Sequence, residues 1–86
     1  MLTLRIPMNE RFAFSQENAA HLANCLSRFD SSIMIHDQNR TINAKSLLGI
    51  LSLGYLKSGM LEFIVEGSDE STVRDAILDY FHGAPD

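Results

Sequence analysis

Hydrophobic residues alternate with polar ones at the start of the chain and then recur at helical spacing. Leu2, Leu4 and Ile6 follow the two-residue period of a half-buried strand. Pro7 has no backbone N–H to donate, so this strand ends there or lies at the edge of a sheet. Ser15 then predicts the N-cap of a helix, because its hydroxyl can accept a free N–H of the first turn. The apolar stripe of that helix comprises Ala19, Leu22, Ala23, Leu26 and Phe29.

The rest of the chain favours three more strands and two more helices. The strands are predicted over residues 33–36, 40–43 and 61–65, and the first two are joined by a turn at 37–39. A short apolar helix is predicted from its cap at Ser46 to Gly54. The last helix opens at residues 67–70 and is predicted to bury Val73, Ala76, Ile77, Tyr80 and Phe81.

The resulting order is β-α-β-β-α-β-α, which predicts an α+β sandwich. Four strands and three helices favour an antiparallel or mixed sheet covered on one face. The 86 residues of the chain are expected to form one domain, 1–86. The hydrophobic fraction of 45% argues against disorder.

Charge and composition exclude several classes of function. The formal net charge is −4 and the seven basic residues are scattered, which argues against direct nucleic-acid binding. No apolar run approaches the length of a transmembrane helix, so we expect no membrane insertion, and the N-terminus does not have the pattern of a signal peptide. The lone cysteine, Cys25, cannot form an internal disulfide, which is typical of a reducing cytoplasm.

Ser46 is the most informative candidate for chemistry. As an N-cap it would stabilise the short helix by roughly 1 kcal/mol. As a kinase substrate it would hold a phosphate where free N–H groups favour an anion, and Lys45 could add a contact. The two interpretations are compatible, because a capping serine can also be phosphorylated.

The short helix is apolar nearly all the way round, so one side of it is expected to lie at the surface. At about 100° per residue, Ile50 and Leu53 fall on one side of the helix. Leu47, Leu48 and Leu51 fall on the opposite side. If the first pair faces the sheet, three leucines lie at the surface beside Ser46, as a partner site or a contact between two copies of the chain.

No residue set predicts an active site, a cofactor or a metal centre. His21 and Cys25 have a spacing that can hold a metal, but two ligands without a third are a weak signal and a solvated helix face explains them better. Asp69 and Glu70 are interpreted as surface charge at the start of the last helix. The residues by themselves therefore make no convincing active site.

One segment resembles the serine-phosphorylation segment of HPr, the phosphocarrier family of the bacterial sugar phosphotransferase system. It reads Ile42-Asn43-Ala44-Lys45-Ser46-Leu47-Leu48-Gly49-Ile50-Leu51-Ser52-Leu53-Gly54. Residues 66–70 also resemble the family's junction between the fourth strand and the last helix. The resemblance, which spans nearly the whole chain, implies an HPr-like open-faced β-sandwich: a four-stranded antiparallel sheet with three helices on one face. It further implies that HPr kinase/phosphorylase phosphorylates Ser46.

The other half of the family's chemistry is missing from the sequence. Phosphocarriers have Gly-Leu-His-Ala-Arg-Pro-Ala at the start of the first helix, where the histidine accepts phosphate, and this chain has Ser15 at the histidine position. The resemblance is therefore to Crh, a member of the family that lacks the histidine and binds a LacI-type transcription factor in catabolite repression. Glu17 stands where HPr and Crh have arginine, and this reversal of charge predicts weaker binding to that transcription factor.

We expect a cytoplasmic HPr-like regulator that is phosphorylated on Ser46 and cannot transfer phosphate through histidine. Its partner-binding residues are predicted to be Lys45, Leu47, Leu48, Leu51, Ser15 and Glu17. Two alternatives stay open at this point. One is an atypical phosphocarrier component with a different acceptor, and the other is a structural interaction module, such as a homodimer, in which Ser46 is only a helix cap.

Overall fold

The computed structural model of the protein describes residues 1–8, 14–53 and 59–82, and Gly54, the expected end of the short helix, lies outside these ranges. In chain order the elements are β1 (Leu2–Pro7), α1 (Gln16–Ser27), β2 (Ser32–Asp37), β3 (Arg40–Asn43), α2 (Leu47–Leu51), β4 (Met60–Glu66) and α3 (Glu70–His82). The predicted order β-α-β-β-α-β-α is confirmed.

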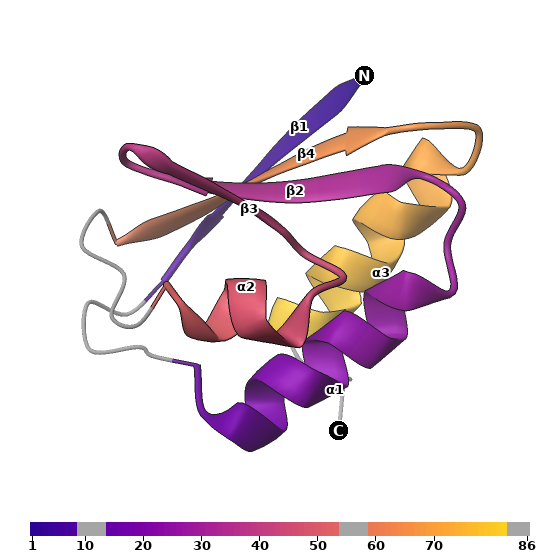
Figure 1. Ribbon diagram of the computed structural model, residues 1–86. Coiled ribbons are helices and arrows are strands. Elements are labelled where there is room, and N and C mark those ends of the chain that lie inside the picture. The colour runs from indigo at the N-terminus through magenta and orange to yellow at the C-terminus, as the bar shows by residue number, and fades with distance from the viewer. Residues whose placement is uncertain (9–13, 54–58, 83–86) are drawn as a thin grey trace.

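The four strands form one antiparallel sheet in the order β1-β4-β2-β3 (Figure 1). The register places Arg5 of β1 and His36 of β2 on either side of Glu62 in β4. On this row the Glu62 carboxylate accepts from Arg5 Nε at 3.0 Å and lies 3.1 Å from His36 Nδ1. The central strand β4 is therefore tied to both neighbours by side chains as well as by the backbone ladder.

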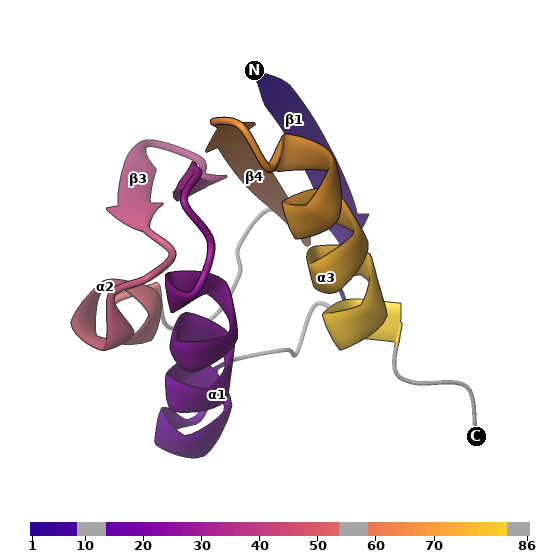
Figure 2. The same ribbon diagram turned by 90° about the vertical axis from the view of Figure 1, so that its right-hand side faces the viewer.

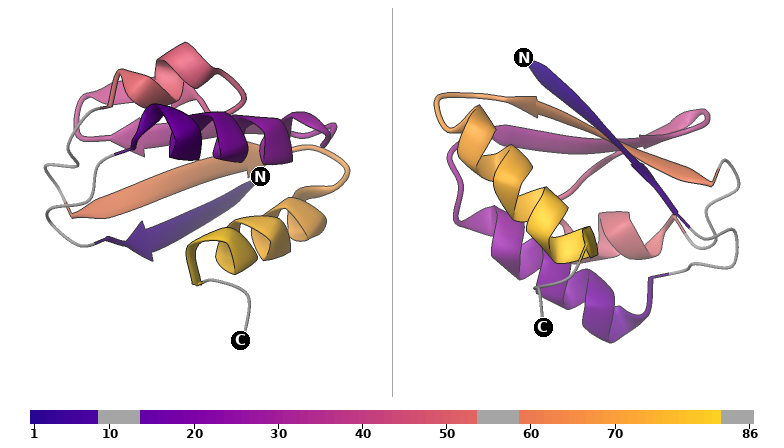
Figure 3. Two further views of the ribbon diagram at one scale, coloured as in Figure 1. Left: turned by 90° about the horizontal axis from the view of Figure 1, so that it is seen from below. Right: turned by 180° about the vertical axis from the view of Figure 1, so that it is seen from behind.

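All three helices cover the same face of the sheet, with α1 between α2 and α3 (Figures 2 and 3). Alternate residues of the strands point into the space between the layers, as the two-residue period predicts. The largest fully buried apolar side chains are Phe63, Leu22, Leu26, Ile33, Ile35, Ile50, Leu61, Ile77, Val65 and Val73. The fold is thus the open-faced α+β sandwich that the resemblance implied.

The carboxylate of Asp69 joins the turn before β2 to the turn before α3 at one end of the sandwich. Asp69, just before α3, accepts the backbone N–H groups of Asp30 and Ser31 at 2.9 and 3.0 Å and also the hydroxyl of Ser31. The Ser31 hydroxyl, followed by the Asp30 N–H, holds the pKa of Asp69 below its usual value. The interpretation of Asp69 as surface charge was therefore wrong, because its partners lie 38 and 39 residues away in the chain.

The same end of the sandwich requires glycine at position 67. The backbone of Gly67 has a φ of +156°, and a Cβ there would lie 2.6 Å from the Cα of Ser31. Its N–H donates to the Glu70 carboxylate at 2.9 Å, and that carboxylate also pairs with the N-terminal ammonium of Met1 at 3.2 Å. The hydrogen bond from Gly67, and to a lesser extent the contact with the N-terminal ammonium, lowers the pKa of Glu70. Glu70 therefore also has structural partners and is not only a surface charge.

Replacing Asp69 by Asn should lower the melting temperature at pH 7. One of the two carboxylate oxygens becomes an NH₂ group, which cannot accept the hydrogen bonds that Asp69 accepts. The lowered pKa means that Asp69 stabilises the fold above its unfolded pKa, close to the 3.8 of a free aspartate. That contribution is lost as the pH falls through the lower folded pKa. Thermal melts between pH 7 and about pH 2 should therefore converge for the wild type and Asp69→Asn at the acidic end.

The matched control is Asp79→Asn on the exposed side of the same helix, which should melt like the wild type at every pH. A wild type and Asp69→Asn that differ equally at all pH values would show that the ionised carboxylate is not what stabilises this junction.

Candidate functional site

The helix α2 is only five residues long, so its neighbours must hold it in place. At its start the Ser46 Oγ accepts the N–H of Gly49 at 3.1 Å, which confirms the predicted N-cap. One turn earlier, the Asn43 side-chain oxygen accepts the N–H of Lys45 at 2.9 Å, and the Asn43 carbonyl accepts the N–H of Ser46 at 3.0 Å. These hydrogen bonds hold the backbone on both sides of Ser46.

The guanidinium of Arg40 holds the other end of α2. Its Nη1 donates to the carbonyl of Ser52 at 2.6 Å and its Nη2 donates to the carbonyl of Leu53 at 2.7 Å. These are carbonyls at the C-terminal end of the helix that lack an intrahelical donor. The same Nη2 lies 3.5 Å from the carboxylate of Asp37, which is buried. Arg40 thus ties α2 to the hairpin that joins β2 and β3.

Ile50 and Leu53 face the core, which is the condition on which the three surface leucines were expected, but the outward side of α2 is narrower than expected. Ile50 and Leu53 are 0% and 2% exposed. Leu48 is 79% exposed, whereas Leu47 and Leu51 are half-buried and pack against the core. The expectation of three leucines at the surface was therefore wrong for two of them, because α1 lies alongside α2 and covers part of that side (Figure 2).

Lys45 does not lie free beside Ser46. Its Nζ donates to the carbonyl of Phe29 at 2.7 Å, just beyond the C-terminal end of α1. A cation at this position satisfies a free carbonyl and interacts favourably with the negative end of the helix dipole. A contact from Lys45 to a phosphate on Ser46 would require this bond to break.

Ser15 and Glu17 lie at the opposite end of α1 from the Lys45 contact. The Ser15 Oγ accepts the N–H of Asn18 at 3.0 Å, as predicted for an N-cap, and Glu17 is an exposed acid in the first turn. The helix between this end and Phe29 has 12 residues and is therefore about 18 Å long. Ser15 and Glu17 thus lie at the start of α1, which belongs to the same layer of helices as α2 (Figure 1).

The described residues place the Ser46 hydroxyl on this layer and form no metal centre. Ser46 is half-exposed at the start of α2, next to the exposed Leu48. His21 Nε2 and Cys25 Sγ are 4.0 Å apart, but among the described residues no third ligand completes a metal-binding group. Within the same ranges no helix has the length and apolar character needed to cross a bilayer.

Sequence reasoning missed the two residues that hold α2, Arg40 and Asn43. Asn43 had a usable signal, because an asparagine three residues before a capping serine is typical of a turn that leads into a helix. Arg40 had none, since its acceptor carbonyls are 12 and 13 residues further along the chain.

The chain matches known proteins along most of its length. Residues 14–82 match the family model described as the PTS HPr component phosphorylation site. A phosphocarrier protein HPr of Treponema pallidum is 39% identical over 59 residues, which cover 69% of this chain and 67% of the relative. The crystal structure of HPr-C-His from Thermoanaerobacter tengcongensis has a TM-score of 0.80 at 27% identity, covering 99% of this chain and 100% of that one.

A second solved structure, Bacillus subtilis Crh, has a TM-score of 0.74 at 20% identity, and the match covers 100% of both chains. It is described as a dimer with a swapped domain. At this identity the likeness shows a shared fold.

Replacing Arg40 by Ala should destabilise the protein by about 1–2 kcal/mol, because two carbonyls of α2 lose a charged donor at a partly solvated site. Urea unfolding measures this loss. Amide hydrogen exchange should also accelerate at Ser52, whose N–H donates to the carbonyl of Leu48, more than in the strands.

Arg74→Ala is the control, because Arg74 pairs only with the exposed Asp75 in the described structure and should cost less than about 0.5 kcal/mol. Equal losses in the two variants would mean that Arg40 does not hold α2.

Proposed function

The chain belongs to the HPr family of the sugar phosphotransferase system, and from this premise we propose that it is a regulatory member whose phosphorylated residue is Ser46. HPr kinase/phosphorylase is the proposed kinase, and carbon catabolite regulation in the cytoplasm is the proposed role. The observation that carries the proposal is the position of Ser46, a half-exposed hydroxyl at the start of an otherwise apolar helix.

The geometry around Ser46 favours a phosphate without refolding of the chain. The Ser46 backbone carbonyl, not its hydroxyl, accepts the N–H of Ile50 at 3.0 Å and closes the first turn of α2. The first N–H groups of a helix have no intrahelical acceptor, so the oxygens of a phosphate on Ser46 can accept hydrogen bonds from them. A phosphoserine adds about 1.5 to 2 negative charges. The modification would therefore change the surface beside Leu48 while Ile50 and Leu53 keep α2 in place.

Ser15 supports a regulatory role over phosphate transfer. It stands at the position that the resemblance assigns to the family's acceptor histidine, and its Oγ is used as the cap of α1. A serine phosphate is a stable ester, whereas transfer to a sugar transporter needs a high-energy phosphohistidine. His21 lies within α1, where its ring stacks on Tyr80 with 5.5 Å between the ring centroids, so it does not replace the missing group.

The downstream partner is proposed to be a protein other than the usual LacI-type transcription factor. Glu17 is exposed and acidic where HPr and Crh have arginine. A partner surface that is complementary to arginine presents acidic groups, and like charges across an interface cost affinity. The exposed Glu17 thus favours a partner with a basic contact at the amino end of α1.

Two other functions remain as alternatives. An atypical phosphocarrier would accept phosphate from phosphoenolpyruvate through enzyme I on a residue other than the family's histidine, whose position is Ser15 here. A structural module, as a homodimer, would need Ser46 only as a cap; Bacillus subtilis Crh is described as a swapped dimer. Acid-labile phosphate would favour the first alternative, and a dimeric mass in light scattering would favour the second.

Incubation with HPr kinase/phosphorylase and ATP should add one phosphate to the wild type and none to Ser46→Ala. Intact-mass spectrometry measures the gain. The reason is that Ser46 is the half-exposed hydroxyl at the start of α2, in the segment that resembles the kinase substrate.

Ser52→Ala is the matched control, because Ser52 is an exposed serine on the same short segment with its hydroxyl bound to the Gly49 carbonyl. This variant should gain phosphate like the wild type. No gain in the wild type, while authentic HPr is phosphorylated in parallel, would overturn the proposal.

Replacing Leu48 by Glu should leave the fold intact and lower the rate of Ser46 phosphorylation by about tenfold, the loss of about 1.4 kcal/mol of binding. Leu48 is 79% exposed, so burial does not oppose the change, and an added charge beside Ser46 would oppose docking of the kinase on an apolar group. Ser71→Glu, an exposed position on α3, is the control and should be phosphorylated at the wild-type rate. An unchanged rate for folded Leu48→Glu would exclude Leu48 from the docking surface.

A further inference from the structure

The middle of α2 is a glycine, and the side chain that it lacks would face Ser46. Gly49 follows Ser46 by three residues, and positions three apart lie on the same side of a helix. We infer that Gly49 is a positioning residue for a phosphate on Ser46, because the bare backbone at position 49 leaves open the space that the phosphoryl group needs. The inference rests on the proposed function and deepens it, since it names a second residue that controls the same site.

The backbone conformation at position 49 does not itself call for glycine. Gly49 lies within α2, and the glycines with a positive φ among the described residues are Gly59 and Gly67. Glycine is one of the least favourable residues in the interior of a helix, because it loses the most backbone freedom on folding. A helix of five residues is already too short to be stable alone. The advantage of glycine here must therefore come from the atoms around position 49.

Those atoms belong to the turn that carries Ser46. A Cβ at position 49 would lie 3.2 Å from the carbonyl oxygen of Asn43, 3.3 Å from the Cβ of Ser46 and 3.4 Å from the Oγ of Ser46. The first two distances are shorter than ordinary van der Waals contacts of a Cβ. The N–H of Gly49 donates to the same Oγ at 3.1 Å. One flank of the Ser46 hydroxyl is thus formed by the backbone of Gly49, with no side chain over it.

A phosphate on Ser46 needs more room on this flank than the hydroxyl does. In the kinase reaction the Ser46 Oγ would attack the γ-phosphorus of ATP, the bond from that phosphorus to the bridging oxygen of ADP would break, and the hydroxyl proton would pass to a base of the kinase. The product has a phosphorus atom with three further oxygens in place of one hydrogen. A Cβ in contact with Oγ would obstruct the phosphoryl oxygens that turn toward α2, whereas the smaller hydroxyl would still fit.

Gly49 also has a purely structural explanation, its close approach to the carbonyl of Asn43. If that contact were the whole reason for glycine, alanine would crowd the carbonyl equally with and without a phosphate. If the phosphate needs the space, the destabilisation by alanine grows when Ser46 is phosphorylated. The coupling between position 49 and the phosphate separates the two explanations, and the stability of unmodified Gly49→Ala does not.

The test is a double-mutant cycle between position 49 and a phosphate on Ser46. The wild type and Gly49→Ala are each produced with serine or with phosphoserine, incorporated during translation, at position 46, and all the full-length proteins are unfolded in urea. The effect of the phosphate on the folding equilibrium constant should be about tenfold less favourable in Gly49→Ala than in the wild type, a coupling of about 1.4 kcal/mol. An equal effect in the two backgrounds would overturn the inference.

No kinase takes part in this cycle, so its outcome is separate from that of the proposed function. A wild type that HPr kinase/phosphorylase leaves unmodified would overturn the proposed function, whereas an absent coupling would overturn the role of Gly49 alone.

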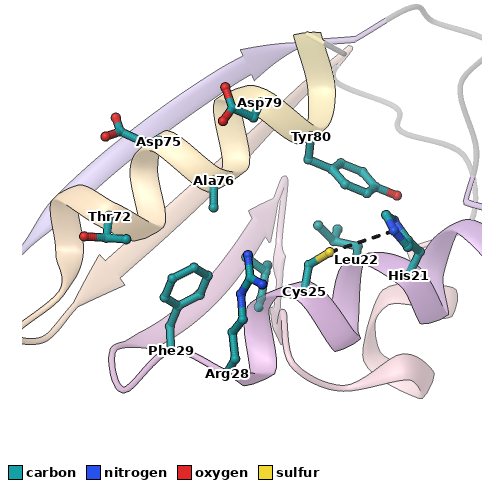
Figure 4. A pocket seen from close by; sticks show the side chains of 11 residues that line it. His21, Leu22, Cys25, Arg28, Phe29, Thr72, Asp75, Ala76, Asp79 and Tyr80 are labelled. Atoms are coloured by element: carbon teal, nitrogen blue, oxygen red, sulfur yellow. Dashed lines mark hydrogen bonds between the residues drawn. The ribbon is translucent and has the colours of Figure 1, made fainter. Parts of the chain in front are cut away.

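The cleft of about 610 Å³ between α1 and α3 provides the matched control. It lies on the side of α1 away from α2, and no residue of α2 lines it (Figures 2 and 4). Ala76 of α3 lines this cleft, so Ala76→Ser adds one side-chain atom to a helix, as Gly49→Ala does, at a place that Ser46 does not border. The phosphate should affect the stability of Ala76→Ser as it affects the wild type. A coupling of the same size at position 76 would overturn the inference, because the phosphate would then respond to any such change in a helix.

A second measurement needs no variant. In the wild type with phosphoserine at position 46, a heteronuclear Overhauser effect is expected between the phosphorus and the Hα protons of Gly49, because the phosphoryl group lies over the bare backbone. No such effect, while the effect on the Cβ protons of residue 46 is visible in the same spectrum, would place the phosphate elsewhere and overturn the inference.

Discussion

Three helices share one face of a four-stranded sheet, and this crowding determines where the surfaces of the protein lie. The inward side chains of β2 and β4 need apolar partners, and α1, α2 and α3 each supply them, through Leu22, Ile50 and Ile77 among others. With three helices on one face, the middle one must have a neighbour on each side. The helix α1 therefore borders α2 with the candidate phosphorylation site and borders α3 with the cleft (Figure 3).

Local features of the fold could be predicted from the sequence, and features that depend on distant residues could not. Ser15 and Ser46 were predicted as caps because the acceptor and the donor are three residues apart. The helical period alone separated Ile50 and Leu53 from the three leucines of α2, but it did not decide which side faces the sheet. The half-burial of Leu47 and Leu51 depends on the helix beside them, and the roles of Arg40 and Asp69 depend on partners 12 to 39 residues away. A single sequence contains no periodicity that links such pairs.

The candidate site combines a modifiable hydroxyl with a rigid support. A five-residue helix is too short to be stable alone, so α2 depends on buried Ile50, on the Ser46 cap and on the Arg40 guanidinium. Its outward surface is then small, with one exposed leucine beside one half-exposed hydroxyl. A surface of this size is sensitive to a single added charge, because no large apolar area remains to compensate for it.

The two candidate partner contacts, a phosphate on Ser46 and the carboxylate of Glu17, belong to different helices. Lys45 connects the Ser46 end of α2 to the carboxyl end of α1, whereas Glu17 lies at the amino end of that helix, about 18 Å away along its axis. Neither the cap hydrogen bond of Ser46 nor the Lys45 contact involves the amino end of α1. Under the proposed function, a partner would therefore meet each of these positions through a separate contact. Under the proposed function, the acidic charge of Glu17 would bear on partner choice, and the exposure of Ser46 would bear on its phosphorylation.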